Sequence, residues 1–155
     1  MKLSDYMDQE LIYVDFHADD KPRLLATLAD LVSRRFPEVS RDALHQKLSR
    51  REEAGSTGIG RGVAIPHATI AGLPKTLCML LCSQKEIPFD AIDHQPVRLI
   101  FLLVSPPGET GLHIKLLARI ARLVKNEEFL NTVATSCSSE ELHRLIAEED
   151  NRHVE

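Results

Sequence analysis

An unbroken run of apolar residues in the second half of the chain limits what this sequence can fold into. Residues Leu99 to Val104 are all apolar, Arg98 stands in front of them, and the breaker Ser105-Pro106-Pro107-Gly108 follows. A strand with one face in water alternates apolar and polar side chains, so a continuous run indicates a strand covered on both faces. We therefore predict an α/β fold, with a central mixed β-sheet flanked by helices on both faces.

The flanking segments supply the remaining elements. Helical spacing of apolar residues predicts helices over about residues 22–35, 41–53 and 110–125, with Ser40 as the candidate N-cap of the second. Asn126 and Ser138 are candidate caps of two more helices. Strands are predicted over residues 11–16, 63–65 and 77–83. The polar tail from Glu148 is expected to fray. No linker, repeat or low-complexity run divides the sequence, so residues 1–155 are expected to form a single domain.

Composition excludes several classes of protein. A formal net charge of −4 and 5% aromatic residues argue against nucleic-acid binding, which needs a basic face or stacking platforms. No stretch approaches the roughly 20 apolar residues of a membrane span, so no membrane insertion is expected. The first residues lack the apolar segment of a signal peptide. We therefore expect a cytoplasmic protein.

The three cysteines do not indicate a disulfide framework, because their number is odd. Cys78 and Cys82 fall in the predicted strand at 77–83, where four residues span about 13 Å, too far for both sulfurs to hold one zinc ion. On a helix the same spacing would place them on one face. We interpret the pair as buried apolar packing and expect no metal site and no cofactor.

A glycine-rich stretch is the feature of the sequence that indicates a chemical function. Residues Gly55 to Gly62 hold four glycines and run into Val63-Ala64-Ile65-Pro66-His67. Backbone N–H groups in such a loop can turn toward an anion, here a phosphoryl group. The Gly-Lys-Ser/Thr end of a Walker A loop is missing, and the glycine spacing also misses the dinucleotide pattern. The alternative is a tight surface turn in which Pro66-His67 merely closes a strand.

Three side chains are candidates for chemistry at this loop. His67 is held by the strand and Pro66, and an unprotonated imidazole nitrogen can act as a nucleophile that carries phosphorus. Arg51 ends the helix before the loop, where it either pairs with phosphate oxygens or simply complements the helix dipole. His113 lies in the first turn of the predicted helix at 110–125, either near the site or as a solvated helix-start residue.

The motifs around these residues resemble a known family. Residues 51–60, 62–68, 87–97 and 112–118 are similar, in order, to the signatures of enzyme IIA domains of the fructose/mannitol type (type 2) in the bacterial phosphoenolpyruvate-dependent phosphotransferase system. The likeness is greatest to its nitrogen-regulatory branch. It implies a phosphohistidine carrier in which His67 accepts a phosphoryl group at Nε2 from an HPr-like phosphocarrier protein. Arg51 and His113 would assist, and the phosphate-binding residues would be Ser56, Thr57, Gly58 and Gly60.

Other functions stay open at this point. The chain resembles a regulatory IIA that acts on target proteins, but a sugar-specific IIA that passes phosphate to a IIB protein, or a non-catalytic binding module, are the alternatives. A metal hydrolase using His67, His113 and an acidic residue is a weaker alternative, because no ligand pair such as H-x-x-x-H is present. Arg61 and Arg98 depart from the family pattern. Arg61 is expected to strengthen attraction of phosphate or carrier, and Arg98 to alter the docking surface.

Overall fold

The apolar run is the central strand of a six-stranded mixed sheet, in a computed structural model that describes residues 2–7, 9–135 and 138–152. This strand is β6 (Val97–Ser105). The sheet order is β1-β5-β6-β3-β2, and β4 also pairs with β6. Strand β5 runs antiparallel to β6, whereas β3 and β4 run parallel to it. The elements follow along the chain as η1 (Leu3–Tyr6), η2 (Gln9–Leu11), β1 (Ile12–Phe16), α1 (Lys21–Arg35), α2 (Arg41–Glu53), β2 (Gly58–Gly60), β3 (Val63–Ala64), β4 (His67–Thr69), β5 (Leu77–Ile87), β6, α3 (Thr110–Leu123), α4 (Glu127–Ala134) and α5 (Ser139–Asn151).

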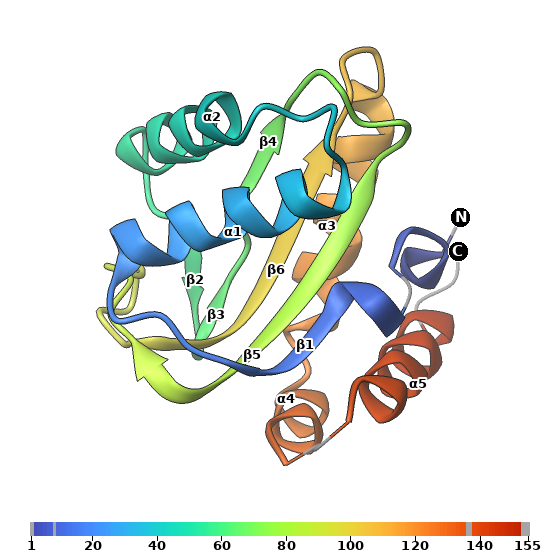
Figure 1. The fold of residues 1–155 in the computed structure, drawn as a ribbon. Helices are drawn as coiled ribbons and strands as arrows, with labels where there is room; N and C mark the ends of the chain where they lie inside the picture. Colours follow the sequence, from blue (N-terminus) through green and yellow to red (C-terminus); the bar gives the residue numbers. More distant parts are fainter. Residues whose placement is uncertain (1, 8, 136–137, 153–155) are drawn as a thin grey trace.

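Helices cover both faces of this sheet, as the apolar run predicts. Figure 1 shows α1 and α2 in front of the sheet and α3 behind it. Side chains of β6 alternate between two buried clusters: Ile100, Leu102 and Val104 pack with α1 and α2, and the intervening side chains pack with α3, α4 and α5. Because both sides of the strand are dry from Leu99 to Val104, no polar residue interrupts that part of β6. The predicted fold class is confirmed.

Helix starts agree with the sequence prediction. The side chains of Ser40, Asn126 and Ser138 accept hydrogen bonds from the backbone N–H groups three residues onward, which places each at the N-cap of its helix. Strand β5 extends past the predicted end to Ile87. Its added residues 84–86 are exposed and polar, so no apolar pattern indicated that they continue the strand.

The prediction that the tail frays from Glu148 is wrong for residues 148–151. These residues complete α5, and both Glu149 and Asp150 are buried. Figure 1 shows α5 beside η1, and the Leu3 N–H donates to Asp150 Oδ2 at 2.7 Å. Asp150 Oδ1 accepts from Arg119 of α3 at 2.5 Å. A polar helix end is ordered here because partners distant in sequence satisfy its carboxylates; residues 153–155 lie outside the described part of the chain.

Cys78 and Cys82 lie in β5 as predicted, and both are free. Cys78 is buried and Cys82 half-buried. Burial raises the pKa of the Cys82 thiol to about 12, so the thiol stays protonated and packs as an apolar group. Cys137 lies outside the described residues. Within the described ranges, no helix has the length and apolar character that crossing a bilayer requires.

Candidate active site: two histidines and an arginine

The backbone at His67 is fixed by the central strand. His67 begins β4, immediately after Pro66, and pairs in parallel register with Leu103 of β6. The Pro66 carbonyl accepts the Leu103 N–H at 3.1 Å. The side chain of His67 is half-buried. The ring therefore projects from the first residue of a short, fixed strand and is partly exposed to solvent.

Contacts of the His67 ring assign its proton. Nδ1 lies 2.8 Å from the Ile65 carbonyl oxygen. A carbonyl can only accept, so Nδ1 carries the hydrogen and donates it. In the neutral ring Nε2 then has a free lone pair, and it accepts a hydrogen bond from Arg51 Nε at 3.2 Å. Nε2 is therefore the ring nitrogen whose lone pair is not protonated, and it is the atom that the family resemblance implies as the phosphoryl acceptor.

Arg51 bridges the end of α2 and the glycine-rich loop. Besides its bond to His67, its terminal nitrogen donates to the Gly55 carbonyl at 2.8 Å. Complementing the helix dipole requires no such contact with a ring 16 residues away. The structure thus brings together the two residues that sequence analysis paired.

His113 lies beside His67, from the first turn of α3. The ring centroids are 5.6 Å apart, with the planes tilted by 59°. His113 is buried, so it is not the solvated helix-start residue of the alternative interpretation. Its Nδ1 lies 2.7 Å from the hydroxyl oxygen of Ser105, the last residue of β6. The end of the central strand therefore contacts one histidine directly and holds the other through β4.

Burial lowers the pKa of both histidines. For His67 burial has the largest effect; the Ile65 hydrogen bond and the Glu52 charge oppose it, and the Arg51 charge adds to it. For His113 burial and the neighbouring His67 act together. Because both pKa values lie below 6.5, both rings are predominantly neutral at pH 7. Since the unfolded chain binds the His67 proton more tightly, its contribution to stability is present above pH 6.5 and is lost as the pH falls through the lowered value.

The glycine-rich loop is already internally bonded. The Thr57 N–H donates to Glu52 Oε1 at 3.1 Å, and its hydroxyl contacts the other carboxylate oxygen. The Gly58 N–H donates to Ser56 Oγ at 3.0 Å. Two of the predicted phosphate-facing amides thus have other partners in this structure. Close packing also requires glycine at position 58, because a Cβ there would lie 2.7 Å from the Ala91 Cβ.

Gly60 and Gly62 shape a hairpin between β2 and β3, which agrees with the tight turn of the alternative interpretation, although strand β2 was not predicted. Gly60, Arg61 and Gly62 all have positive φ angles, and they turn β2 back onto β3. A left-handed backbone costs glycine little, which explains the G-x-G spacing without a ligand. The predicted role of Gly60 in phosphate binding stays a prediction.

Glu52 is the site residue that sequence analysis left without a role. Its side chain is 5% exposed and pairs with Lys21 Nζ at 2.8 Å. It also holds Thr57, so one carboxylate joins the start of α1, the end of α2 and the loop. An acidic residue in the last turn of a helix opposes the helix dipole, and that conflict is the signal that could have drawn attention to it.

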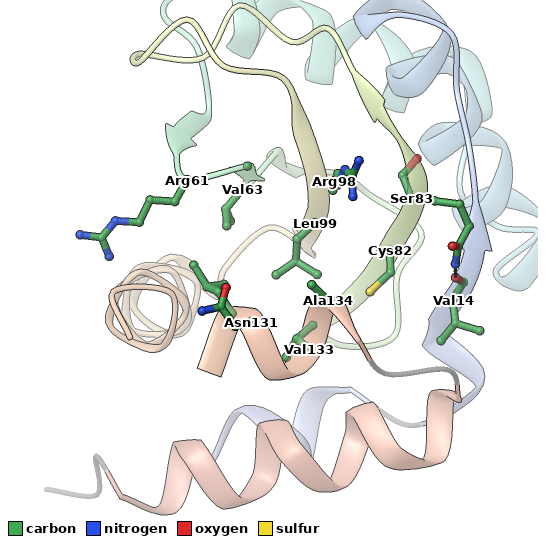
Figure 2. A pocket seen from close by; sticks show the side chains of 13 residues that line it. Val14, Arg61, Val63, Cys82, Ser83, Arg98, Leu99, Asn131, Val133 and Ala134 are labelled. Carbon is green, nitrogen blue, oxygen red and sulfur yellow. Dashed lines mark hydrogen bonds between the residues drawn. The ribbon is translucent and has the colours of Figure 1, made fainter. Parts of the chain in front are cut away.

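The two departures from the family pattern contact neither site histidine. Arg61 donates to the Lys125 carbonyl at 2.7 Å, and Arg98 pairs with Glu86 at 3.4 Å. Both border a cavity of about 210 Å³ between the sheet and α4. Figure 2 shows apolar side chains such as Leu99 and Val133 facing each other there, while the Arg61 guanidinium points away. The expected attraction of phosphate by Arg61 therefore has no support in these contacts.

Charge replacements beside His67 are expected to move its pKa in opposite directions. Arg51→Ala raises the pKa toward 6.5, because a guanidinium disfavours an imidazolium next to it. Glu52→Gln lowers the pKa further, because a favourable negative charge is lost. NMR titration of the ring protons measures both shifts. Arg50→Ala is the matched control, since it removes the same charge from the exposed adjacent position of α2; shifts of the same sign in the first two variants would contradict this assignment.

Fold and site together define an α/β domain built around an uncharged imidazole that lies between an arginine and a second histidine. The chain belongs to the family described as "Phosphoenolpyruvate-dependent sugar phosphotransferase system, EIIA 2", whose model matches residues 5–149. It is therefore a phosphotransferase-system component. Among the described residues, no group of three or more histidine, cysteine, aspartate or glutamate side chains is arranged to hold a metal ion.

Individual relatives agree with this membership. A nitrogen regulatory protein of Pseudomonas aeruginosa is 32% identical over 138 residues, which cover 89% of this chain and 90% of that protein. The crystal structure of the nitrogen regulatory protein IIA-Ntr from Neisseria meningitidis superposes with a TM-score of 0.86 at 31% identity, covering 92% of this chain and 97% of that one. Enzyme IIA for mannitol from Escherichia coli, in complex with phosphorylated enzyme IIB, shares the fold with a TM-score of 0.74 at 19% identity, covering 90% and 95%.

Proposed function

We propose that this chain is a phosphohistidine carrier of the nitrogen-regulatory branch, which accepts a phosphoryl group on His67 Nε2 from an HPr-like phosphocarrier protein. The observation that carries the proposal is the hydrogen bond from Nδ1 to the Ile65 carbonyl. It leaves the lone pair on Nε2, and the lowered pKa keeps that nitrogen unprotonated at neutral pH. A nucleophile in this form needs no general base.

The phosphoryl transfer forms one P–N bond, breaks another and requires no proton transfer. The Nε2 lone pair of His67 forms a bond to the phosphorus held on the donor's phosphohistidine. The donor's P–N bond breaks on the opposite side, and its electron pair returns to the donor ring. The His67 ring gains positive character once both nitrogens are substituted, and the Ile65 carbonyl, which accepts the Nδ1–H, stabilises that charge.

Arg51 and His113 stabilise the transferred group. In the unphosphorylated protein Arg51 Nε donates to the lone pair of His67 Nε2, so this hydrogen bond breaks before Nε2 can bond to phosphorus. Arg51 then turns its N–H groups to the phosphoryl oxygens. His113 acts as a neutral donor next to the ring. Loop amides from Ser56 to Gly60 add further donors after Thr57 and Gly58 exchange their present partners.

Regulation is the proposed outcome of phosphorylation. The nitrogen regulatory proteins of Pseudomonas aeruginosa and Neisseria meningitidis align with about nine tenths of this chain at 31–32% identity. A phosphoryl group places about −1.5 to −2 charges at the site, which changes how target proteins dock there. Because the donor obtains its phosphoryl group from phosphoenolpyruvate, the proposed location is the cytoplasm. The alternative is transfer to a IIB protein, as in the sugar-specific members of the family.

A reconstituted phosphorylation assay tests the proposal. The chain is incubated with labelled phosphoenolpyruvate, enzyme I and an HPr-like carrier, and an acid-labile adduct is measured. Adding a IIB protein then distinguishes the two outcomes, because loss of label to IIB favours the sugar-specific alternative. No adduct with several active carriers would leave a non-catalytic binding module as the function.

Arg51→Ala is expected to slow phosphorylation of the chain by about 10- to 100-fold. A hydrogen bond to a charged group contributes about 1.5–3 kcal/mol, and Arg51 is placed to provide such bonds to the transferring oxygens. Stopped-time labelling measures the rate constant. Arg50→Ala, exposed on the same helix, should label at the rate of the unmodified chain. Equal rates in the two variants would remove Arg51 from the mechanism.

A further inference from the structure

Ser105 occupies a junction between the two histidines. It is the last residue of β6, is 1% exposed, and pairs in register with Thr69, the last residue of β4. Its carbonyl accepts the Ile70 N–H at 2.9 Å, which closes the end of the strand that carries His67. Its hydroxyl lies 2.7 Å from His113 Nδ1. Ser105 therefore contacts both the backbone of the segment that follows His67 and the ring of His113.

The direction of the Ser105–His113 hydrogen bond follows from what each atom can do. A buried hydroxyl hydrogen needs an acceptor. Within residues 2–7, 9–135 and 138–152, His113 Nδ1 is the polar atom that the Ser105 hydroxyl contacts. If Nδ1 carried the ring proton, the serine hydrogen would be buried without an acceptor, which costs about 1–3 kcal/mol. The serine therefore donates, and Nδ1 accepts.

We propose that Ser105 is a positioning residue that keeps His113 in the tautomer with its proton on Nε2, so that this N–H is available to the phosphoryl group on His67. The inference rests on the proposed function. The Ile65 carbonyl makes His67 a ring with a lone pair on Nε2, and the Ser105 hydroxyl makes His113 a ring with a hydrogen on Nε2. Two adjacent rings of the same residue type thus serve as nucleophile and donor.

The start of α3 holds His113 against Ser105. The carboxylate of Glu109 accepts the Thr76 N–H at 3.2 Å and also contacts the Thr76 hydroxyl. Thr76 is fully buried next to β5. The His113 N–H in turn donates to the Glu109 carbonyl at 2.9 Å. These bonds anchor the first helical turn to the sheet, so the imidazole stays within hydrogen-bonding distance of the Ser105 hydroxyl.

Tautomers of the unphosphorylated chain provide the first test. Long-range ¹H–¹⁵N correlation spectra at neutral pH distinguish a protonated from an unprotonated ring nitrogen. We expect His113 with its proton on Nε2 and His67 with its proton on Nδ1. A proton on His113 Nδ1 in the unmodified protein would overturn the proposal.

Variants of Ser105 provide the second test. Ser105→Ala is expected to slow phosphorylation of His67 about tenfold, because it removes one hydrogen bond and such a loss corresponds to about that factor. Ser105→Thr keeps the hydroxyl and restores most of the rate. Ser83→Ala is the matched control, because Ser83 is also a buried strand serine but its hydroxyl donates to the Lys85 carbonyl. Equal rates in Ser105→Ala and the unmodified chain, or equally slow Ala and Thr variants, would contradict the role.

The two tests separate this inference from the proposed function. If no carrier labels the unmodified chain, the proposed function fails, while the tautomers are still measured in the unphosphorylated protein. If labelling occurs but His113 carries its proton on Nδ1, the role of Ser105 fails and the carrier function stands. Should Ser105→Ala fail to fold, the spectra of the unmodified chain decide the question.

Discussion

His67→Ala is expected to lose all acid-labile label in the reconstituted phosphorylation assay. The reason is chemical: alanine has no nitrogen to bond with phosphorus, and the neighbouring His113 is expected to hold its proton on Nε2, with Nδ1 bonded to Ser105. Autoradiography after gel electrophoresis, with an acid wash, measures the adduct. Labelling should fall to the background of a reaction without enzyme I.

Two controls accompany this variant. His17→Ala removes an exposed histidine that pairs with Asp19, and it should label like the unmodified chain. Urea unfolding checks that His67→Ala is folded, which we expect because the ring is only half-buried. Retention of label in folded His67→Ala would place the phosphoryl group on another residue and end the proposal.

Asp150→Ala is expected to lower the free energy of unfolding by about 3–5 kcal/mol, because it leaves the Arg119 charge buried without its partner. The two side chains are 2% and 10% exposed, and the carboxylate also accepts the Leu3 N–H. Both contacts join α5 to elements distant in sequence. Chemical denaturation monitored by circular dichroism measures the change.

Matched variants separate the buried pair from surface charge. Glu148→Ala breaks the exposed pair with Arg144, one turn of α5 away, and should cost about 0.5 kcal/mol or less. The double variant Arg119→Met/Asp150→Leu removes both buried charges and should recover part of the loss, although the Leu3 N–H stays unpaired. Similar costs for Asp150→Ala and Glu148→Ala would mean that the buried pair adds no stability beyond a surface contact.

Local patterns predicted the parts of the fold that local forces specify. The apolar run of β6 indicated helices on both faces, and Ser40, Asn126 and Ser138 marked helix starts through bonds to amides three residues onward. The strand β2 was not predicted: the glycines were interpreted either as a loop for anions or as a tight surface turn, and Gly60 to Gly62 form such a turn. Sequence analysis misjudged the end of α5 because the composition of a tail does not reveal a partner 147 residues away.

The candidate site divides in the same way. The pairing of Arg51 with His67 was predictable, because the motif from Arg51 to His67 places a cation and an imidazole on either side of a glycine-rich loop. The protonation of His67 and His113 was not predictable, since the Ile65 carbonyl and the Ser105 hydroxyl set it through bond directions that no spacing encodes. Glu52 escaped notice because its partners, Lys21 and Thr57, belong to other elements.

The sequence by itself determined the kind of fold and which side chains can perform chemistry, because apolar periodicity, caps and glycine spacing act over a few residues. Tertiary structure alone decided which nitrogen of His67 carries the proton, what His113 bonds to, and that Asp150 closes the C-terminal helix onto the N-terminal segment. These outcomes depend on the direction and burial of single hydrogen bonds, which exist only after the sheet has brought separate segments within about 3 Å of each other.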